Sequence, residues 1–208
     1  MNDQDLADRL AARLEGEFAQ HPRTHVHVPA GWETIVAALA DHLDEVWPDW
    51  QLKQVKQKLG YLEVYLAEPP DEIAGELDSL VAAARRAATH RCERCGTTTG
   101  APYTAAVGGW RMTLCEACRD EAIRAWLREV GLTVFDLATA GGPRPDRLAE
   151  LNEIVTVLEV ALVPEELTAW LRRPHSQFQG ATALEAIAAG RASDVHAAAA
   201  ALVERSDW

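Results

Sequence analysis

The chain has 208 residues, 48% of them hydrophobic, and a formal net charge of −12. This is enough apolar sequence for one large domain or two small ones. Residues 1–130 carry a net charge of −7 and residues 131–208 one of −5, which disfavours strong DNA binding through the phosphates. No apolar run reaches the roughly 18 residues that span a bilayer. The acidic first ten residues lack the pattern of a secretory signal, so we expect a cytoplasmic protein without a membrane segment.

Two amphipathic helices are predicted near the start of the chain. Residues 3–20 place an apolar side chain at every fourth position, and residues 32–47 form a second apolar face that ends before Pro48. The connector between them holds three histidines. No cysteine or carboxylate stands at a convincing ligand spacing, so we interpret the connector as a solvated loop rather than a metal site.

A change of period predicts a β-hairpin after these helices. Apolar and polar side chains alternate over residues 61–66, as in a strand with one buried face, and Gly60 predicts a turn between two antiparallel strands. The two prolines at 69–70 then end the hairpin and open a third helix, which extends to about His90.

All the lysines of the chain, Lys53, Lys56 and Lys58, lie in the first of these strands. The second strand carries two tyrosines beside them, Tyr61 and Tyr65. Basic side chains interleaved with aromatic rings can form a stacking surface for single-stranded nucleic acid. Lysines also protect the edge of a sheet against aggregation. We favour this second interpretation.

The four cysteines form two CxxC pairs. Cys92 and Cys95 are separated from Cys115 and Cys118 by 19 residues, and the segments YTAAV and WRMTL between them predict a hairpin. Two such pairs converge to a tetrahedron of thiolates, which suits one zinc ion. We therefore predict a zinc ribbon over residues 92–118. Four sulfur ligands leave no position for a reacting water, so we predict a structural zinc rather than a catalytic one.

The rest of the chain is predicted to be helical. Thr182 and Glu185 make a capping box, and Gly190 stands where that helix should end. The predicted fold class is α+β: N-terminal helices with a β-hairpin and a four-cysteine zinc ribbon, followed by an all-helical C-terminal domain. We place the two domains at residues 1–130 and 131–208.

Two parts of the chain resemble known families. KQKLGYLEVY, CERCG and GWRMTLC resemble a bacterial four-cysteine zinc-ribbon module of unknown function. The last 60 residues or so resemble the toxin-binding domain of the Xre/MbcA/ParS-type antitoxins, with a tryptophan–leucine pair, a proline turn, a glycine–threonine element and a helix ending in glycine. The matching residues are Trp170, Leu171, Pro174, Gly180, Thr182, Leu184 and Gly190.

The antitoxin resemblance implies a protein partner, a toxin of the NAD-degrading RES type, whose active site the C-terminal helices would occlude. We expect the contacts to come from the last helix and the tail, through Leu202, Arg205, Asp207 and Trp208. Catalytic motifs such as GxSxG, HExxH or a phosphate loop are missing from the sequence, so we do not expect an enzyme. Self-association is compatible with the sequence.

The alternative function is a nucleic-acid-associated transcriptional regulator. Its contact surface would combine the zinc ribbon with the strand that carries Lys53, Lys56 and Lys58. The family commonly has a helix-turn-helix unit before the toxin-binding domain, and residues 132–155 resemble a degenerate form of this unit. The basic residues of its recognition stretch are few, so we expect weak binding or none to double-stranded DNA.

Overall fold

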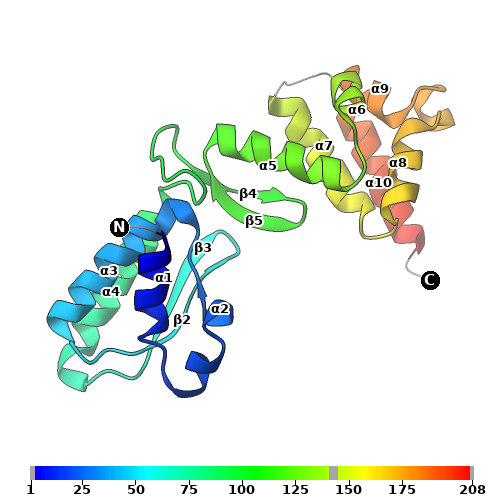
Figure 1. Ribbon diagram of the computed structural model, residues 1–208. Helices are drawn as coiled ribbons and strands as arrows, with labels where there is room; N and C mark the ends of the chain where they lie inside the picture. Colours follow the sequence, from blue (N-terminus) through cyan, green and yellow to red (C-terminus); the bar gives the residue numbers. More distant parts are fainter. Residues whose placement is uncertain (1–2, 141–144, 207–208) are drawn as a thin grey trace. The chain divides into compact units, whose positions relative to one another are not determined.

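The computed structural model describes residues 3–140 and 145–206 (Figure 1). The described residues form a mixed α+β fold with a three-stranded sheet, a separate two-stranded hairpin beside the four cysteines, and a helical C-terminal region. The predicted fold class is therefore confirmed. Within the described residues, no helix has the length and apolar character that crossing a membrane requires.

The first helix is shorter than predicted. Helix α1 spans Asp3–Ala11, and a separate 3-10 turn, η1, spans Gly16–Gln20. Between them the chain turns at residues 12–13, and Leu14 then bridges Leu52 of strand β2. The Leu52 N–H donates to the carbonyl of Arg13, and the Leu52 carbonyl accepts from the N–H of Glu15. Pairing with a strand that is distant in the sequence thus interrupts a local helical pattern.

The sheet has the order β1-β2-β3. Strands β2 (Leu52–Lys58) and β3 (Tyr61–Leu66) are antiparallel, as predicted. They are joined by a turn in which Leu59 and Gly60 both have positive φ, a conformation that fits the twist of a hairpin. Strand β1, Val26–His27, pairs in parallel with the other side of β2 and was not expected from the sequence. It follows the short helix α2, which spans Pro22–His25.

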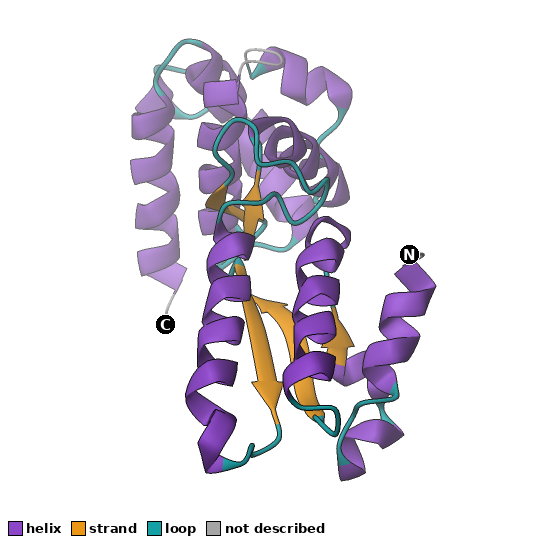
Figure 2. Ribbon diagram, turned by 90° about the vertical axis from the view of Figure 1, so that its left-hand side faces the viewer, coloured by secondary structure: helices purple, strands orange, loops and turns teal. Residues whose placement is uncertain are grey.

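Three helices cover one face of this sheet. They are α1, α3 (Glu33–Val46, after the 3-10 turn η2 at Ala30–Trp32) and α4 (Asp71–Thr89), and they lie on the same side of β2 and β3 (Figure 2). Their apolar faces form one core with the inward residues of the strands, among them Val55 and Val64. We call this side the inner face of the sheet and the opposite side the outer face.

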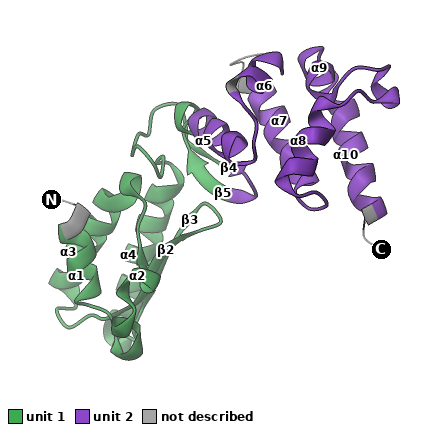
Figure 3. Cartoon of the chain, turned by 45° about the vertical axis from the view of Figure 1, so that its right-hand side comes forward, with its two compact units in different colours: residues 1–105, 111–118 green, residues 106–110, 119–208 purple. Residues whose placement is uncertain are grey.

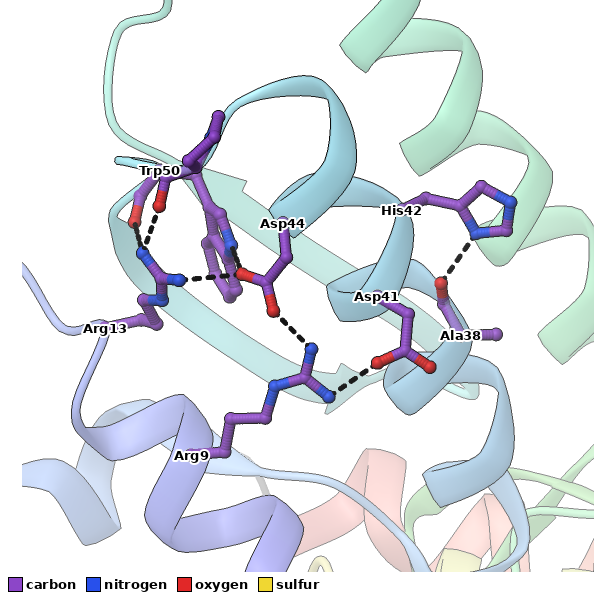
Figure 4. Close-up of polar contacts among 8 residues, drawn as sticks. Arg9, Arg13, Ala38, Asp41, His42, Asp44 and Trp50 are labelled. Carbon is purple, nitrogen blue, oxygen red and sulfur yellow. Dashed lines mark hydrogen bonds and ion pairs between the residues drawn. The ribbon is translucent and has the colours of Figure 1, made fainter.

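A polar cluster holds α1 against α3. Asp44 accepts hydrogen bonds from Arg9, Arg13 and the indole N–H of Trp50 (Figure 4). Arg9 also bonds Asp41, at 2.7 Å. The guanidinium of Arg13 lies 5.0 Å from the centre of the Trp50 ring, close enough for a cation–π contact.

The cysteine region carries the predicted hairpin. Strands β4 (Tyr103–Val107) and β5 (Trp110–Leu114) pair around Gly108 and Gly109, which both have positive φ. Helix α5, Glu116–Glu129, begins directly after β5.

From residue 131 onward, all the regular elements of the described residues are helices or helical turns. The buried side chains of this C-terminal region are mostly leucine, isoleucine, valine, alanine and aromatic residues from successive helices, and α10 packs along α7. Its elements are α6 (Val134–Thr139), α7 (Pro145–Leu158), α8 (Pro164–Arg172), the 3-10 turn η3 (Ser176–Phe178), α9 (Ala183–Ala188) and α10 (Ala192–Ser206).

The chain divides into two compact units (Figure 3). Unit 1 comprises residues 1–105 and 111–118, and unit 2 comprises residues 106–110 and 119–208. The tip of the β4–β5 hairpin and most of α5 thus group with the C-terminal helices. A division of the protein into domains at residue 131 stays a prediction.

Candidate metal centre

The four cysteines meet at one place in unit 1. One sulfur atom from each of Cys92, Cys95, Cys115 and Cys118 lies within 4.8 Å of every other. The Sγ atoms of Cys95 and Cys115 lie 3.8 Å apart. Cys92 and Cys115 are buried, whereas Cys95 is exposed. A cluster of four sulfurs with one buried side and one open side can accept a metal ion from solvent.

Tight local structure aims the first pair of sulfurs. The backbone N–H of Gly96 donates to the carbonyl of Cys92, at 2.9 Å, and the N–H of Cys92 donates to the carbonyl of Thr97. Gly96 has a φ of +72°, which a residue with a side chain adopts only with strain. The second pair comes from the end of β5 and the first turn of α5. The first CxxC pair therefore lies in a tight turn over residues 92–97, which we call the knuckle, and the second lies at the junction between a strand and a helix.

The knuckle is packed onto the start of α3. The N–H of Gly31 donates to the carbonyl of Glu93 at 2.8 Å, and the Trp32 indole donates to the carbonyl of Arg91 at 2.9 Å. A Cβ added to Gly31 would lie 2.1 Å from the carbonyl oxygen of Cys92. Only glycine permits this approach, so the metal centre is built into the core of unit 1 rather than appended to it.

A buried carboxyl group joins the knuckle to the hairpin. Glu93, 3% exposed, accepts a hydrogen bond from the backbone N–H of Thr113 at 2.9 Å and a longer one from Gln57. Its own backbone N–H donates to the carbonyl of Thr113. Burial raises the pKa of Glu93, and the bonds from Thr113 and Gln57 partly offset that rise. Glu93 thus fixes β5 beside the first two cysteines.

The thiols compete for negative charge. Burial of Cys92 opposes its ionisation, but backbone N–H groups of Cys95 and Cys115 outweigh this effect and lower its pKa to about 7. Burial, together with the neighbouring sulfurs, raises the pKa of Cys118 well above its usual range. Ionisation of one thiol therefore opposes ionisation of the next, and a bound cation would remove this repulsion between thiolates.

The donor set determines which chemistry fits. Four soft sulfur ligands in a tetrahedral arrangement suit zinc or iron, and do not suit magnesium or calcium, which prefer oxygen. Among the described residues, no other group of three or more histidine, cysteine or carboxylate side chains is placed to hold a metal. The three histidines of the early connector do not form such a group.

The other predicted site residues are spread over the two units. In unit 2, Leu202 is half-buried and Arg205 exposed near the end of α10, while Asp207 and Trp208 lie outside the described residues. In unit 1, two of the lysines are half-buried and the remaining three residues are exposed on the β2–β3 hairpin: Lys53 and Lys56, then Lys58, Tyr61 and Tyr65.

Sequence reasoning missed the groups that support the cysteines. Gly31, Trp32 and Glu93 all contact the knuckle backbone or brace it against the hairpin. The position of Glu93 inside a CxxC pair was the only available signal. No spacing rule connects Gly31 to a cysteine 61 residues further along the chain.

Comparison with protein-family models, with curated proteins and with solved structures yields no match for this chain. The function has to be argued from its own residues.

Proposed function

We propose that the four cysteines hold one zinc ion and that this ion is structural. The support comes from four converging thiols, two of them buried, braced by Gly31 and Glu93. With four protein ligands, zinc has no open position at which a water could be activated. Elemental analysis of the purified chain should find one zinc and no stoichiometric iron. Equal loading by iron, with a coloured product, would contradict the choice of metal.

We further propose that the protein is not an enzyme and that unit 2 binds a protein partner in the manner of the Xre/MbcA/ParS-type antitoxins. The observation that carries this proposal is that the resembling residues build one continuous element from α8 to α9. Trp170, Leu171 and Leu184 are buried, and Pro174 pairs with Thr182 in an isolated bridge.

The other residues that carry the resemblance lie in the turns of this element. Gly180 and Gly190 both have positive φ. The hydroxyl of Thr182 accepts a hydrogen bond from the backbone N–H of Glu185 at 3.1 Å, and the Glu185 carboxylate accepts one from the backbone N–H of Thr182. Each matching residue therefore contributes to the buried core or to a turn of this element. The pattern is that of a folded element, not a coincidence of composition, and this supports the likeness to the antitoxin domain.

In this proposal the partner is a RES-type NAD-degrading toxin, and the mechanism is occlusion. The last turn of α10, with Leu202 and Arg205, and the following Asp207 and Trp208 cover the toxin's active site. An apolar residue at the centre of such an interface commonly contributes about 2 kcal/mol or more to binding. A carboxylate can pair with a basic group of the toxin pocket.

The test is co-expression with a RES-domain protein encoded beside this chain, with cellular NAD and growth as readouts. The full chain should restore both. Removing residues 206–208, or changing Arg205→Glu, should abolish the rescue and leave thermal stability unchanged. Exposed Glu153→Gln on α7 is the matched control and should still rescue. Rescue by the shortened chain, with lower stability, would place the interface elsewhere.

A further inference from the structure

The outer face of the β2–β3 sheet gathers cations and aromatic rings in cross-strand pairs. The register sets Lys58 opposite Tyr61, Lys56 opposite Glu63 and Gln54 opposite Tyr65. Val55 and Val64, which also pair, belong to the core on the inner face. Because side chains alternate between the faces of a strand, these three pairs all lie on the side away from α3 and α4.

The two tyrosines present open surface. Tyr61 is 48% exposed and Tyr65 is 42% exposed, and four positions along a strand separate them by about 13 Å. Directly opposed side chains have Cβ atoms about 5 Å apart, and diagonal ones about 7 Å. Lys58 therefore flanks Tyr61, and Lys56 stands diagonally between both rings.

The one acidic residue of these pairs is already neutralised. Glu63 forms an ion pair with Arg85 of α4, at 2.9 Å. Arg85 also donates to the carbonyl of Val64, at 3.2 Å, so it occupies a backbone acceptor of β3. An extended peptide that added itself to β3 would compete with Arg85 for that acceptor. The face of the sheet is more accessible to a partner than the edge.

Protection of a sheet edge does not account for the lysines. Strand β2 is the central strand, with β3 on one side and β1 on the other at Val55 and Lys56. The same side of β2 is also occupied at Leu52, whose N–H donates to the carbonyl of Arg13 and whose carbonyl accepts from the N–H of Glu15. The lysines thus lie in the middle of a sheet, in a chain whose net charge is −12.

We infer that this outer face binds single-stranded nucleic acid, with bases stacked on Tyr61 and Tyr65 and phosphates held by Lys56 and Lys58. Exposed rings accept any base because every base has a π-face, and neighbouring ammonium groups follow the backbone. Charge complementarity selects a polyanion, and the paired rings select one that can stack. Duplex DNA hides its base faces and fits this surface poorly. The inference does not depend on the proposed binding of a toxin.

The experiment uses the full chain purified with zinc and a fluorescent oligonucleotide of unstructured sequence, titrated by anisotropy. We expect measurable binding at about 50 mM salt, with a slope of log K against log salt near −1.4 for two phosphate contacts. Tyr61→Thr and Tyr65→Thr keep a strand-forming residue and should each weaken binding about tenfold. Lys56→Gln with Lys58→Gln should make the slope shallower by about 1.4.

Matched controls remove the same groups elsewhere. Tyr103→Thr removes an exposed tyrosine from β4, and Arg86→Gln with Arg128→Gln removes two exposed charges from helices. These variants should bind like the unmodified chain. Circular dichroism and zinc content confirm folding of each variant. Dissociation constants above about 100 μM at about 50 mM salt, or equal losses in test and control variants, would overturn the inference. So would binding that needs the lysines but not the tyrosines, which would identify a general polyanion or acidic-protein surface.

Discussion

The two units obtain their stability from different sources. In unit 1 the ribbon is tied to the rest by a few polar contacts, among them the backbone bond from Gly31 to Glu93 and the bonds of the buried Glu93 carboxyl, and its four thiols are placed so that they could hold a cation. Unit 2 is filled mainly by apolar side chains of successive helices. Its buried carboxylate Asp136 is paired with Arg172. The first arrangement should depend on a metal and on exact backbone fit, and the second on neither.

Removing the metal should have the largest effect, and it should be confined to unit 1. Because structural zinc sites couple binding to folding, chelation or Cys92→Ser should destabilise the ribbon by about 5 kcal/mol or more. Hydrogen exchange should show lost protection over residues 92–105 and 111–118, which belong to unit 1, and retained protection over 145–206. Equal loss in both units would remove the contrast between them.

The next effect concerns the fit at Gly31. Gly31→Ala would bring a Cβ to 2.1 Å from the carbonyl oxygen of Cys92, and we expect a loss of about 3 kcal/mol together with weaker zinc binding. Gly75→Ala in α4 is the control, since a Cβ there meets nothing within 4 Å. It should stabilise the helix by about 0.5–1 kcal/mol. Denaturant unfolding with competitive zinc titration measures both quantities.

In unit 2 the ion pair between the buried Asp136 and the half-exposed Arg172 offers the sharpest test. Arg172 donates two hydrogen bonds to Asp136, and this pairing holds the pKa of that carboxyl well below its usual range. A lowered pKa in the folded state stabilises the fold above the unfolded pKa of about 3.9 and loses that effect as the pH falls toward the folded value.

Asp136→Asn should therefore cost about 2 kcal/mol at neutral pH. The difference from the unmodified chain should be constant above about pH 5 and shrink below about pH 4. Urea unfolding followed by tryptophan fluorescence at each pH measures it, with exposed Glu153→Gln as control. A difference that grows with acid would mean that the carboxyl is not the stabilising form.

The smallest predicted effect concerns the cluster between α1 and α3. Asp44 accepts three hydrogen bonds, whereas Asp41 accepts one from the same Arg9 and is far more exposed. Asp44→Asn should cost about 1 kcal/mol, and Asp41→Asn less than about 0.5 kcal/mol. Thermal unfolding at low and high salt distinguishes them, because the exposed pair should be screened first. Equal effects would show that the number of bonds does not matter here.

Local chemistry made much of this fold predictable. The cysteine pairs, the turn at Gly60, the capping box at Thr182 and the helix end at Gly190 each depend on residues a few positions apart. The same reasoning placed α3 and α4 to within a few residues.

The errors arose where distant segments meet. Leu14 leaves the predicted first helix to form a bridge with Leu52, and Val26 with His27 is too short a strand to leave a periodic signal. The support of Cys92 by Gly31 is likewise non-local. The predicted partner contacts could not be derived in the same way. The residues of unit 2 that carry the resemblance lie in its own core and turns, so the sequence pattern indicates how unit 2 folds more directly than what it binds.

The chain passes between the two units more than once, and this affects how their gene segments can recombine. Because the hairpin tip at 106–110 belongs to unit 2, neither unit is encoded by one continuous stretch of gene. Asn152 on α7 donates to the carbonyl of Ala106 and accepts the N–H of Gly108. A recombination that transferred the helices alone would separate Asn152 from both groups. We expect gene shuffling to carry the ribbon and the helices together, as a single heritable block.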